Sequence, residues 1–311
     1  MEERPLGATG VSVSRLILGC GNFGGIGSAP EFFGQGESEA DAFTVMDAAW
    51  AAGITTFDTA DAYGGGRSET AIGKWIAARG FRPQLTTKTF NPMDVGEDQG
   101  LAPARIRRQL VSSLTRLGVD SVDLYLTHAP DPDTPLDDTL GVLEELRAEG
   151  LIGAFGGSNV DGAVLEAAGG RYAWVQNSYS LLDREAEAEV LPLCRAQGLG
   201  FTPFSPLAGG WLTGKYRRDE PPPAGSRMTL RSGPYEHLRN DAVFDGLEAL
   251  ERAAAARGVE SATLAFAWLL SSPDVTAVVV GPRRPAHLEP ALRALELDLS
   301  GADRAELAAL L

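Results

Sequence analysis

The chain has 311 residues, of which 44% are hydrophobic and 22% are charged. This balance is typical of a packed globular protein and excludes a disordered or fibrous chain. A formal net charge of −15 argues against binding of nucleic acid or anionic membranes. Any anionic ligand would therefore need a local cluster of arginines or the N-terminus of a helix.

The sequence also argues against a membrane span and a metal site. No apolar run approaches the ~20 residues that a membrane-spanning helix needs, and the start MEERPLG lacks the features of a signal peptide. Cys20 and Cys194 are too few for a disulfide framework or a four-cysteine metal site. We expect a cytoplasmic protein without a metal, in which Cys20 is a packing residue.

The predicted elements alternate regularly along the chain. Phe43, Met46 and Trp50 fall on one face of a helix that begins after Ser38 and ends at Gly53. Further helical patterns follow, including one that ends at Gly118 and one that runs from Pro135 to Gly150. Eight short β-rich runs separate these patterns and end near Cys20, Asp58, Phe90, His128, Asn159, Asn177, Ser205 and Gly281.

Strands that alternate with helices of this length imply parallel β-α-β units. Eight such units favour a closed (β/α)8 TIM barrel with outer helices over an open sheet. An irregular stretch at about 206–240 contains three consecutive prolines and five arginines. We interpret it as a long loop over the active face, within one domain that spans residues 1–311.

Gly19, Gly21 and Gly24 form a GxGxxG pattern directly after the first predicted barrel strand. A dinucleotide fingerprint of this form requires the third glycine to open a helix, whereas GGIGSAPEFFG follows here. Asp41 also falls inside the next helix rather than at the end of a strand. The glycines therefore favour a shaped loop over a Rossmann domain.

Four polar residues fall at the C-terminal ends of predicted strands. Lys88 stands inside the apolar strand LTTKTF, where a buried ammonium needs a carboxylate partner, and Asp58 ends the preceding strand. Alone, this pair would be an ordinary buried salt bridge. Tyr63 and His128 fall at the same rim, although singly they would be a loop aromatic and a rim histidine. An ammonium beside Tyr63 is expected to lower the pKa of the phenol and make it a general acid.

The motifs FDTADAYGGGRSETAIGKW, TTK, LYLTHAP, GGSN, VQNSYSLLDR and FSPLAGGWLTGKY resemble the successive motifs of aldo-keto reductases. The resemblance covers nearly the whole chain. It implies a catalytic tetrad of Asp58, Tyr63, Lys88 and His128, which reduces a small-molecule carbonyl with hydride from NADPH. Tyr63 would protonate the carbonyl oxygen, and neutral His128 would orient it.

The resemblance also implies a cofactor site and a substrate pocket. Cofactor residues carried over from it are Gly21, Asn22, Asp58, Ser158, Asn159, Gln176, Phe204, Ser205, Pro206, Leu207, Gly209, Leu212, Lys215, Gly281, Arg283, Arg284 and His287. Residues expected to line the substrate pocket are Phe23, Tyr63, Phe90, His128 and Trp211.

Arg283 and Arg284 are expected to bind the 2′-phosphate of NADPH, because they follow the eighth strand at the start of a helix. Alternatively, they are surface charges that balance Glu289 and Glu296.

Three positions depart from the family pattern. Gly157 replaces a bulkier residue of the motif GVSN, which we expect to enlarge or loosen the rim there. His287 replaces a glutamine, and Ala291 replaces an asparagine that usually faces the adenine of the cofactor.

Two other functions remain open at this stage. A barrel aldolase would use Lys88 to form a Schiff base, although pairing with Asp58 keeps the ammonium protonated. A binding or regulatory protein on the same fold, like the channel-associated β subunits that aldo-keto reductases resemble, would turn over little or no substrate.

Overall fold

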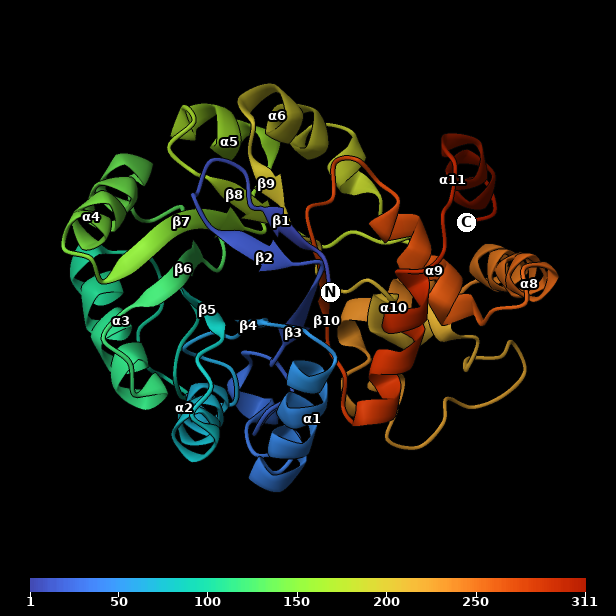
Figure 1. Ribbon diagram of the computed structural model, residues 1–311, viewed down its shortest axis with the longest axis horizontal. Helices are drawn as coiled ribbons and strands as arrows, with labels where there is room; N and C mark the ends of the chain where they lie inside the picture. The colour runs from blue at the N-terminus through green and yellow to red at the C-terminus, as the bar shows by residue number, and fades with distance from the viewer.

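A computed structural model describes all residues, 1–311, as an eight-stranded barrel of parallel strands surrounded by helices (Figure 1). The strands pair in the order β10-β3-β4-β5-β6-β7-β8-β9. Hydrogen bonds from Thr276 N to Phe201 O (2.8 Å) and from Val279 N to Pro203 O (3.0 Å) close the ring. The predicted TIM barrel is therefore confirmed. Its strands are β3 (Leu16–Gly19), β4 (Thr56–Asp58), β5 (Gln84–Thr89), β6 (Val122–Thr127), β7 (Ile152–Ser158), β8 (Trp174–Gln176), β9 (Gly200–Phe201) and β10 (Val278–Val280).

Helices cover the outside of the barrel. The α-helices are α1 (Glu39–Ala51), α2 (Arg67–Arg79), α3 (Pro103–Leu117), α4 (Leu136–Ala148), α5 (Gly162–Ala168), α6 (Val190–Gln197), α7 (Arg227–Leu230), α8 (Asp241–Ala256), α9 (Ser261–Leu270), α10 (Glu289–Ala294) and α11 (Gly301–Ala308). The 3-10 helices are η1 (Pro30–Phe32), η2 (Glu185–Glu187), η3 (Ala208–Thr213), η4 (Gly233–Leu238) and η5 (Pro285–Leu288). None of the helices is long and apolar enough to cross a membrane.

The predicted start of α1 is correct, and Phe43, Met46 and Trp50 all lie against the hydrophobic core as its predicted apolar face. Ser38 caps the helix, since its hydroxyl accepts a hydrogen bond from the backbone N–H of Asp41 at 3.2 Å. Met46 is fully buried, whereas Phe43 and Trp50 are only half-buried. The Trp50 ring stacks on the ring of Phe81, with 4.8 Å between ring centroids.

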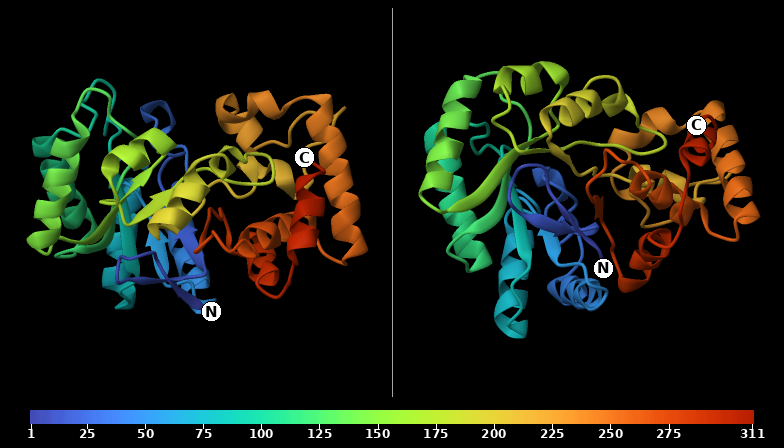
Figure 2. Two further views of the ribbon diagram at one scale, coloured as in Figure 1. Left: turned by 90° about the horizontal axis from the view of Figure 1, so that it is seen from above. Right: turned by 45° about the horizontal axis from the view of Figure 1, so that its top comes forward.

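A hairpin that the sequence did not predict plugs the N-terminal end of the barrel. Strands β1 (Glu3–Pro5) and β2 (Ser12–Ser14) pair antiparallel, and Leu6 and Val13 are buried with the apolar side chains inside the barrel. Gly7, at the turn, has φ +53° and lies so close to the barrel that a Cβ would stand 2.4 Å from Gly200 N. Only glycine tolerates this approach. In Figure 2 (left) the N-terminus lies at the bottom of the molecule.

Arg15 ties the same end of the barrel together. Its buried guanidinium donates hydrogen bonds to the carbonyl oxygens of Val275 (2.8 Å), Thr276 (2.5 Å) and Leu270. These acceptors precede β10 or end α9, so one side chain joins the first and last strands of the barrel. Burial lowers the pKa of Arg15 to about 10.

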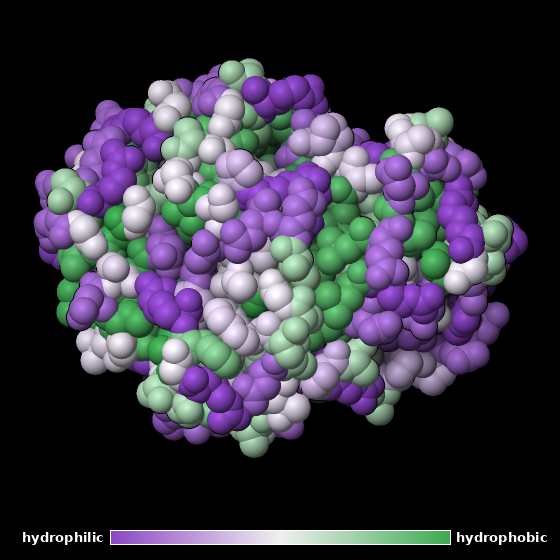
Figure 3. All heavy atoms as spheres, in the orientation of Figure 1, coloured by the Kyte–Doolittle hydropathy of each residue, from purple (hydrophilic) through white to green (hydrophobic).

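The predicted long loop at 206–240 contains the short helices η3, α7 and η4, so it is more ordered than expected. Gly21 and Gly24 lie in the loop between β3 and α1, which excludes a Rossmann helix start there. In Figure 3, apolar residues gather in the middle of the face that Figure 1 presents, where β10 and α9 lie, and hydrophilic residues cover much of the outer helices.

Candidate active site

The four tetrad residues come from adjacent segments at the C-terminal end of the barrel. Asp58 is the last residue of β4, Lys88 lies near the end of β5, and His128 directly follows β6. Tyr63 lies in the loop between β4 and α2. The strands β4, β5 and β6 are neighbours in the barrel, which brings these side chains together as predicted.

Lys88 is the centre of the cluster. Its Nζ donates to Asp58 Oδ1 at 2.5 Å and to the carbonyl oxygen of Thr59 at 2.9 Å, and it lies 3.4 Å from the hydroxyl of Tyr63. Gln176 Nε2 donates to the other carboxylate oxygen of Asp58 at 2.8 Å. The side chains of Lys88 and Asp58 are 1% and 3% exposed, so the pair is almost fully removed from water.

Three consecutive glycines place Tyr63. Gly64, Gly65 and Gly66 have φ values of +60°, +64° and +85°, a left-handed turn that other residues rarely adopt. This turn directs the phenol back toward Lys88 before α2 begins. Gly21 lies on the other side of the ring, where a Cβ would be 3.5 Å from it.

Lys88 lowers the pKa of Tyr63 as expected, but burial outweighs this effect, so the expectation of a lowered pKa was wrong. Burial raises the pKa of Tyr63; the charge of Lys88 opposes this, and that of Asp58 adds to it. The phenol therefore carries its proton at neutral pH. The pKa of Lys88 is also raised, because Asp58 and Tyr63 together outweigh the burial that lowers it. A protonated ammonium cannot attack a carbonyl carbon, which argues against the Schiff-base aldolase.

His128 is neutral, as expected. Burial, with a smaller effect of the Lys88 charge, holds the pKa of the imidazole well below its usual value. Asn91 Nδ2 lies 3.2 Å from His128 Nδ1, so the ring accepts at Nδ1 and keeps its proton on Nε2. The imidazole lies edge-on to the Tyr63 ring, with 5.4 Å between centroids. The tetrad therefore holds two neutral hydrogen-bond donors, the O–H of Tyr63 and the N–H of His128, beside the buried ammonium of Lys88.

The family model of the aldo/keto reductase family matches residues 15–311. The chain belongs to the aldo/keto reductase family. It is therefore an oxidoreductase of a family that uses nicotinamide cofactors.

Two relatives by sequence agree with this assignment, and a solved structure shares the fold. An uncharacterized oxidoreductase, YrpG of Bacillus subtilis, is 38% identical over 96% of this chain and 92% of its own. An NADH-specific methylglyoxal reductase of Escherichia coli is 34% identical over 97% and 96%. The structure of a glycerol dehydrogenase from Gluconobacter oxydans has the same fold, with a TM-score of 0.85 at 24% identity over 99% of this chain and 94% of that one.

Several residues that the aldo-keto reductase pattern assigns to the nicotinamide lie beside the tetrad. Asn159, with φ +56°, follows β7, and its Nδ2 donates to His128 O at 2.8 Å. Ser158 is buried, and its Oγ accepts from Asn159 Nδ2 at 3.3 Å. Phe204 packs on the apolar interior of the barrel. Gln176 already holds Asp58 through its amide nitrogen, so its free oxygen is the atom left for the cofactor.

The predicted cofactor loop after β9 starts with two strained residues. Ser205 and Ala208 have φ values of +54° and +47°. Tyr235 of η4 lies against Gly209, where a Cβ would be 2.7 Å from its ring. Pro206 and Leu212 are buried and Leu207 is half-buried, so these three predicted residues offer mainly backbone atoms to a ligand.

Basic residues from two distant segments gather next to this loop. They are Lys215, Arg227, Arg231, Arg283, Arg284 and His287. Burial and then the charges of Arg227 and Arg283 lower the pKa of Lys215. Burial and then the charges of Arg284, Lys215 and Arg283 lower the pKa of His287. These mutually repelling groups form a cationic cluster in a chain of net charge −15.

The two arginines that were predicted to bind phosphate both have partners in the protein, and these partners are not the glutamates that the alternative interpretation named. Arg283 forms an ion pair with Glu37, and its Nη1 donates to Gly225 O at 2.6 Å. Arg284 Nε donates to His287 Nε2 at 2.9 Å. Neither arginine forms an ion pair with Glu289 or Glu296, and Gly281 lies exposed nearby.

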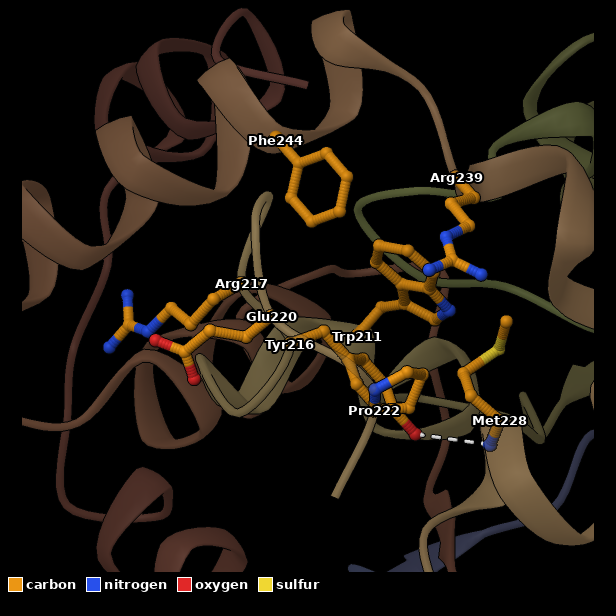
Figure 4. A pocket seen from close by; sticks show the side chains of 8 residues that line it. All are labelled: Trp211, Tyr216, Arg217, Glu220, Pro222, Met228, Arg239 and Phe244. Carbon is orange, nitrogen blue, oxygen red and sulfur yellow. Dashed lines mark hydrogen bonds between the residues drawn. The ribbon is translucent and has the colours of Figure 1, made fainter. Parts of the chain in front are cut away.

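Trp211 does not join the tetrad, although it was expected to line the substrate pocket. Its ring packs on Tyr216 of the same long loop and on Phe244 of α8, with centroids 5.0 and 5.5 Å away. Figure 4 shows this pocket, where Tyr216 OH accepts from Met228 N at 3.4 Å. The pocket is lined by Trp211, Tyr216, Arg217, Glu220, Pro222, Met228, Arg239 and Phe244, none of which is a tetrad residue.

The other residues expected to line the substrate pocket, Phe23 and Phe90, differ in how much surface they expose. Phe23 is 1% exposed and packs in the core, so it presents little surface to a substrate, whereas Phe90 is half-buried at the rim. Gly157 does not loosen the rim as expected. A Cβ there would stand 2.8 Å from Val160 and 3.1 Å from the Tyr172 ring, so these side chains fill the space.

Sequence reasoning missed three site residues. Asn91, which orients His128, is a polar residue just after β5 and could have been found from that position. Arg227 donates to the predicted cofactor residue Asn22 at 3.0 Å. Its position among the loop arginines was visible, but its contact with the loop after β3 was not. Glu37 gave no signal, because it precedes a helix as many exposed glutamates do.

Proposed function

We propose that this protein reduces an aldehyde or a ketone to an alcohol, with hydride from NADPH and a proton from Tyr63. The observation that carries this proposal is the contact of one buried ammonium, Lys88 Nζ, with both Asp58 (2.5 Å) and the Tyr63 hydroxyl (3.4 Å). Two free, buried cysteines suit a reducing compartment, so a cytoplasmic location is part of the proposal.

Each tetrad residue has a distinct task in this reaction. Tyr63 holds its proton at neutral pH and gives it to the carbonyl oxygen, while Lys88 stabilises the phenolate left behind. Asp58 keeps Lys88 charged. His128 donates from Nε2 to the same carbonyl oxygen and so orients the substrate. When bound, NADPH supplies the hydride that the carbonyl carbon accepts.

The residues around the tetrad fit a nicotinamide dinucleotide. The polar atoms of Asn159 and Gln176 suit a carboxamide, and the cationic cluster beside the loop after β9 suits phosphate groups. A 2′-phosphate adds two negative charges to the ligand, which the cluster favours. This charge argument supports NADPH over NADH.

The proposal is tested by single-turnover oxidation. Protein loaded with NADPH, and with NADH in parallel, is mixed with a panel of aldehydes and ketones, and cofactor absorbance is followed. Tyr63→Phe should slow hydride transfer by ~10²- to 10⁴-fold because the acid is deleted and the ring is kept. Cofactor affinity should stay within about twofold.

Retained turnover in Tyr63→Phe would contradict the tetrad mechanism. If the wild-type protein binds NADPH but none of the aldehydes or ketones causes the bound NADPH to be oxidised, the protein is a binding protein on this fold rather than a reductase.

A further inference from the structure

The loop before α1 contacts the cationic cluster through hydrogen bonds from Arg227 to Asn22 and from Arg231 to Ile26, and through one ion pair, that of Glu37 with Arg283. Glu37 Oε1 accepts from Arg283 Nε, and Arg283 Nη1 donates to Gly225 O at 2.6 Å. We call Glu37, Arg283 and Gly225 the clasp. It joins the segment before α1, the long loop and the segment after β10, which are far apart in the sequence.

Like Asp58 and Glu69, Glu37 is an ion-paired carboxylate that is buried. Its side chain is 6% exposed, whereas that of Arg283 is 42% exposed. Its second oxygen, Oε2, is buried and accepts no hydrogen bond. A buried carboxylate oxygen without a donor costs free energy, and native proteins usually supply a partner for such an atom. Glu37 Oε2 is therefore a buried acceptor that lacks a donor, and a ligand hydroxyl that reached it would supply one.

Cations surround this acceptor. Burial and then the charges of Arg231 and Arg283 lower the pKa of Arg227, so added negative charge is favoured in its neighbourhood. Arg283 Nη2 makes no hydrogen bond to the protein, which leaves one face of the guanidinium free. The clasp thus places one acidic acceptor and one basic donor side by side.

These two groups match the one position at which the nicotinamide cofactors differ. NADH has a hydroxyl at the 2′ position of the adenosine ribose, and NADPH has a phosphate there. An acidic side chain that accepts from the 2′-hydroxyl selects NADH, and an arginine that binds the 2′-phosphate selects NADPH.

We propose that Glu37 is a specificity-determining residue that reads the 2′ position together with Arg283. Oε2 accepts from the 2′-hydroxyl of NADH, whereas Arg283, released from Glu37 or through its free Nη2, binds the 2′-phosphate of NADPH. The carboxylate repels that phosphate and so narrows the preference for NADPH that the cationic cluster creates. This inference rests on the proposed use of a nicotinamide dinucleotide.

The test measures dissociation constants for NADPH and NADH by isothermal titration calorimetry in the wild type and in three variants. Glu37→Gln removes the charge, Arg283→Gln removes the phosphate partner, and Glu31→Gln is the matched control. Glu31 lies in the same loop, is exposed and forms no ion pair.

In Glu37→Gln, NADPH should bind more tightly and NADH more weakly, so that the ratio of the two affinities moves toward NADPH by at least about tenfold. Arg283→Gln should move the ratio by at least about tenfold toward NADH. Glu31→Gln should leave it within about twofold. Arg283 is partly exposed, so its variant keeps the test decisive even if Glu37→Gln fails to fold.

A Glu37→Gln variant that folds and changes both affinities equally would overturn the role of Glu37. An unchanged ratio in Arg283→Gln would remove the clasp from the ribose site. If the wild type binds neither cofactor, the proposed function itself fails, and this inference fails with it.

Discussion

The two ends of the barrel bury charge in different ways. At the N-terminal end, the guanidinium of Arg15 is satisfied by three backbone carbonyl oxygens and faces no ionisable partner in the barrel. At the C-terminal end, Lys88 is held by a carboxylate and shares its charge with a phenol. The first arrangement holds distant segments of the chain together. The second places the hydroxyl proton of Tyr63 beside a buried cation.

Backbone conformation follows the same division. The non-glycine residues with positive φ are Asn159, Ser205 and Ala208, and all of them follow β7 or β9 at the C-terminal end. Such conformations cost free energy and persist where the surroundings hold them in place. Backbone strain and the buried Lys88–Asp58 ion pair thus both lie at the C-terminal end of the barrel, whereas the hydrogen bonds of Arg15 stabilise the opposite end.

The largest effect is expected from Lys88→Met. Turnover should fall by ~10²- to 10⁴-fold, because the phenolate of Tyr63 loses its counter-charge. Asp58 would be left buried and unpaired, so the free energy of unfolding should fall by about 3–5 kcal/mol. Stopped-flow turnover and urea unfolding measure the two effects.

Lys74→Met is the matched control for this variant. Lys74 pairs with Glu39 on the surface and should change neither quantity appreciably. Normal turnover in Lys88→Met would mean that the buried pair is structural, and the contrast between the two ends would fail.

Asp61, at the C-terminal end of the barrel, is expected to make the free energy of unfolding depend on pH. It is fully buried two residues before Tyr63, and burial raises its pKa to about 7, with Glu69 adding to the rise. Since the folded pKa lies above the ordinary value of 3.8, the neutral acid favours the native state, and this stability is lost as the pH rises through 7.

Asp61→Asn removes this pH dependence because the amide is neutral throughout. At pH 8 the variant should gain up to a few kcal/mol in the free energy of unfolding over the wild type, and the gain should vanish near pH 4. Urea unfolding across this range measures it. A gain that is largest at low pH would contradict the assignment.

Arg15→Met tests the opposite end. Three carbonyl oxygens would lose a charged donor, so the free energy of unfolding should fall by about 2–3 kcal/mol. Turnover per folded molecule should stay within twofold. Arg4→Met, which removes an exposed arginine paired with Glu2, should be nearly silent. A large loss of turnover in Arg15→Met would show that the two ends are coupled.

The smallest effect is expected from Cys20→Ser. The thiol is fully buried, and burial, followed by the charge of Asp58, raises its pKa well above the usual value. It is therefore a poor nucleophile although it lies near the tetrad. kcat/KM should change by less than tenfold, which corresponds to ~1.4 kcal/mol. A greater loss would give Cys20 a part in catalysis.

The strands and the tetrad could be predicted because their signals are local. β-rich runs ended at Asp58 and His128, and parallel strands bring their C-terminal ends together. The hairpin β1-β2 was missed because its strands, ERP and SVS, contain few apolar residues and so lack the β-rich composition of the barrel strands.

Long-range electrostatics could not be predicted in the same way. The pKa of Tyr63 depends on the balance between burial and the Lys88 charge, and sequence gives only the charge. The clasp depends on Glu37 and Arg283, which are 246 residues apart. Their pairing follows from barrel closure, not from any local pattern.

The hydrogen bond from Arg15 to Val275 spans 260 residues. The hairpin and Arg15 leave the ribosome before their partners around residues 200 and 275 are made. Contacts of such long range slow folding, because a long chain segment must be ordered before they form. The barrel therefore cannot close until β10 has been made, and a chain truncated before β10 would expose an unpaired edge of β3 to other chains.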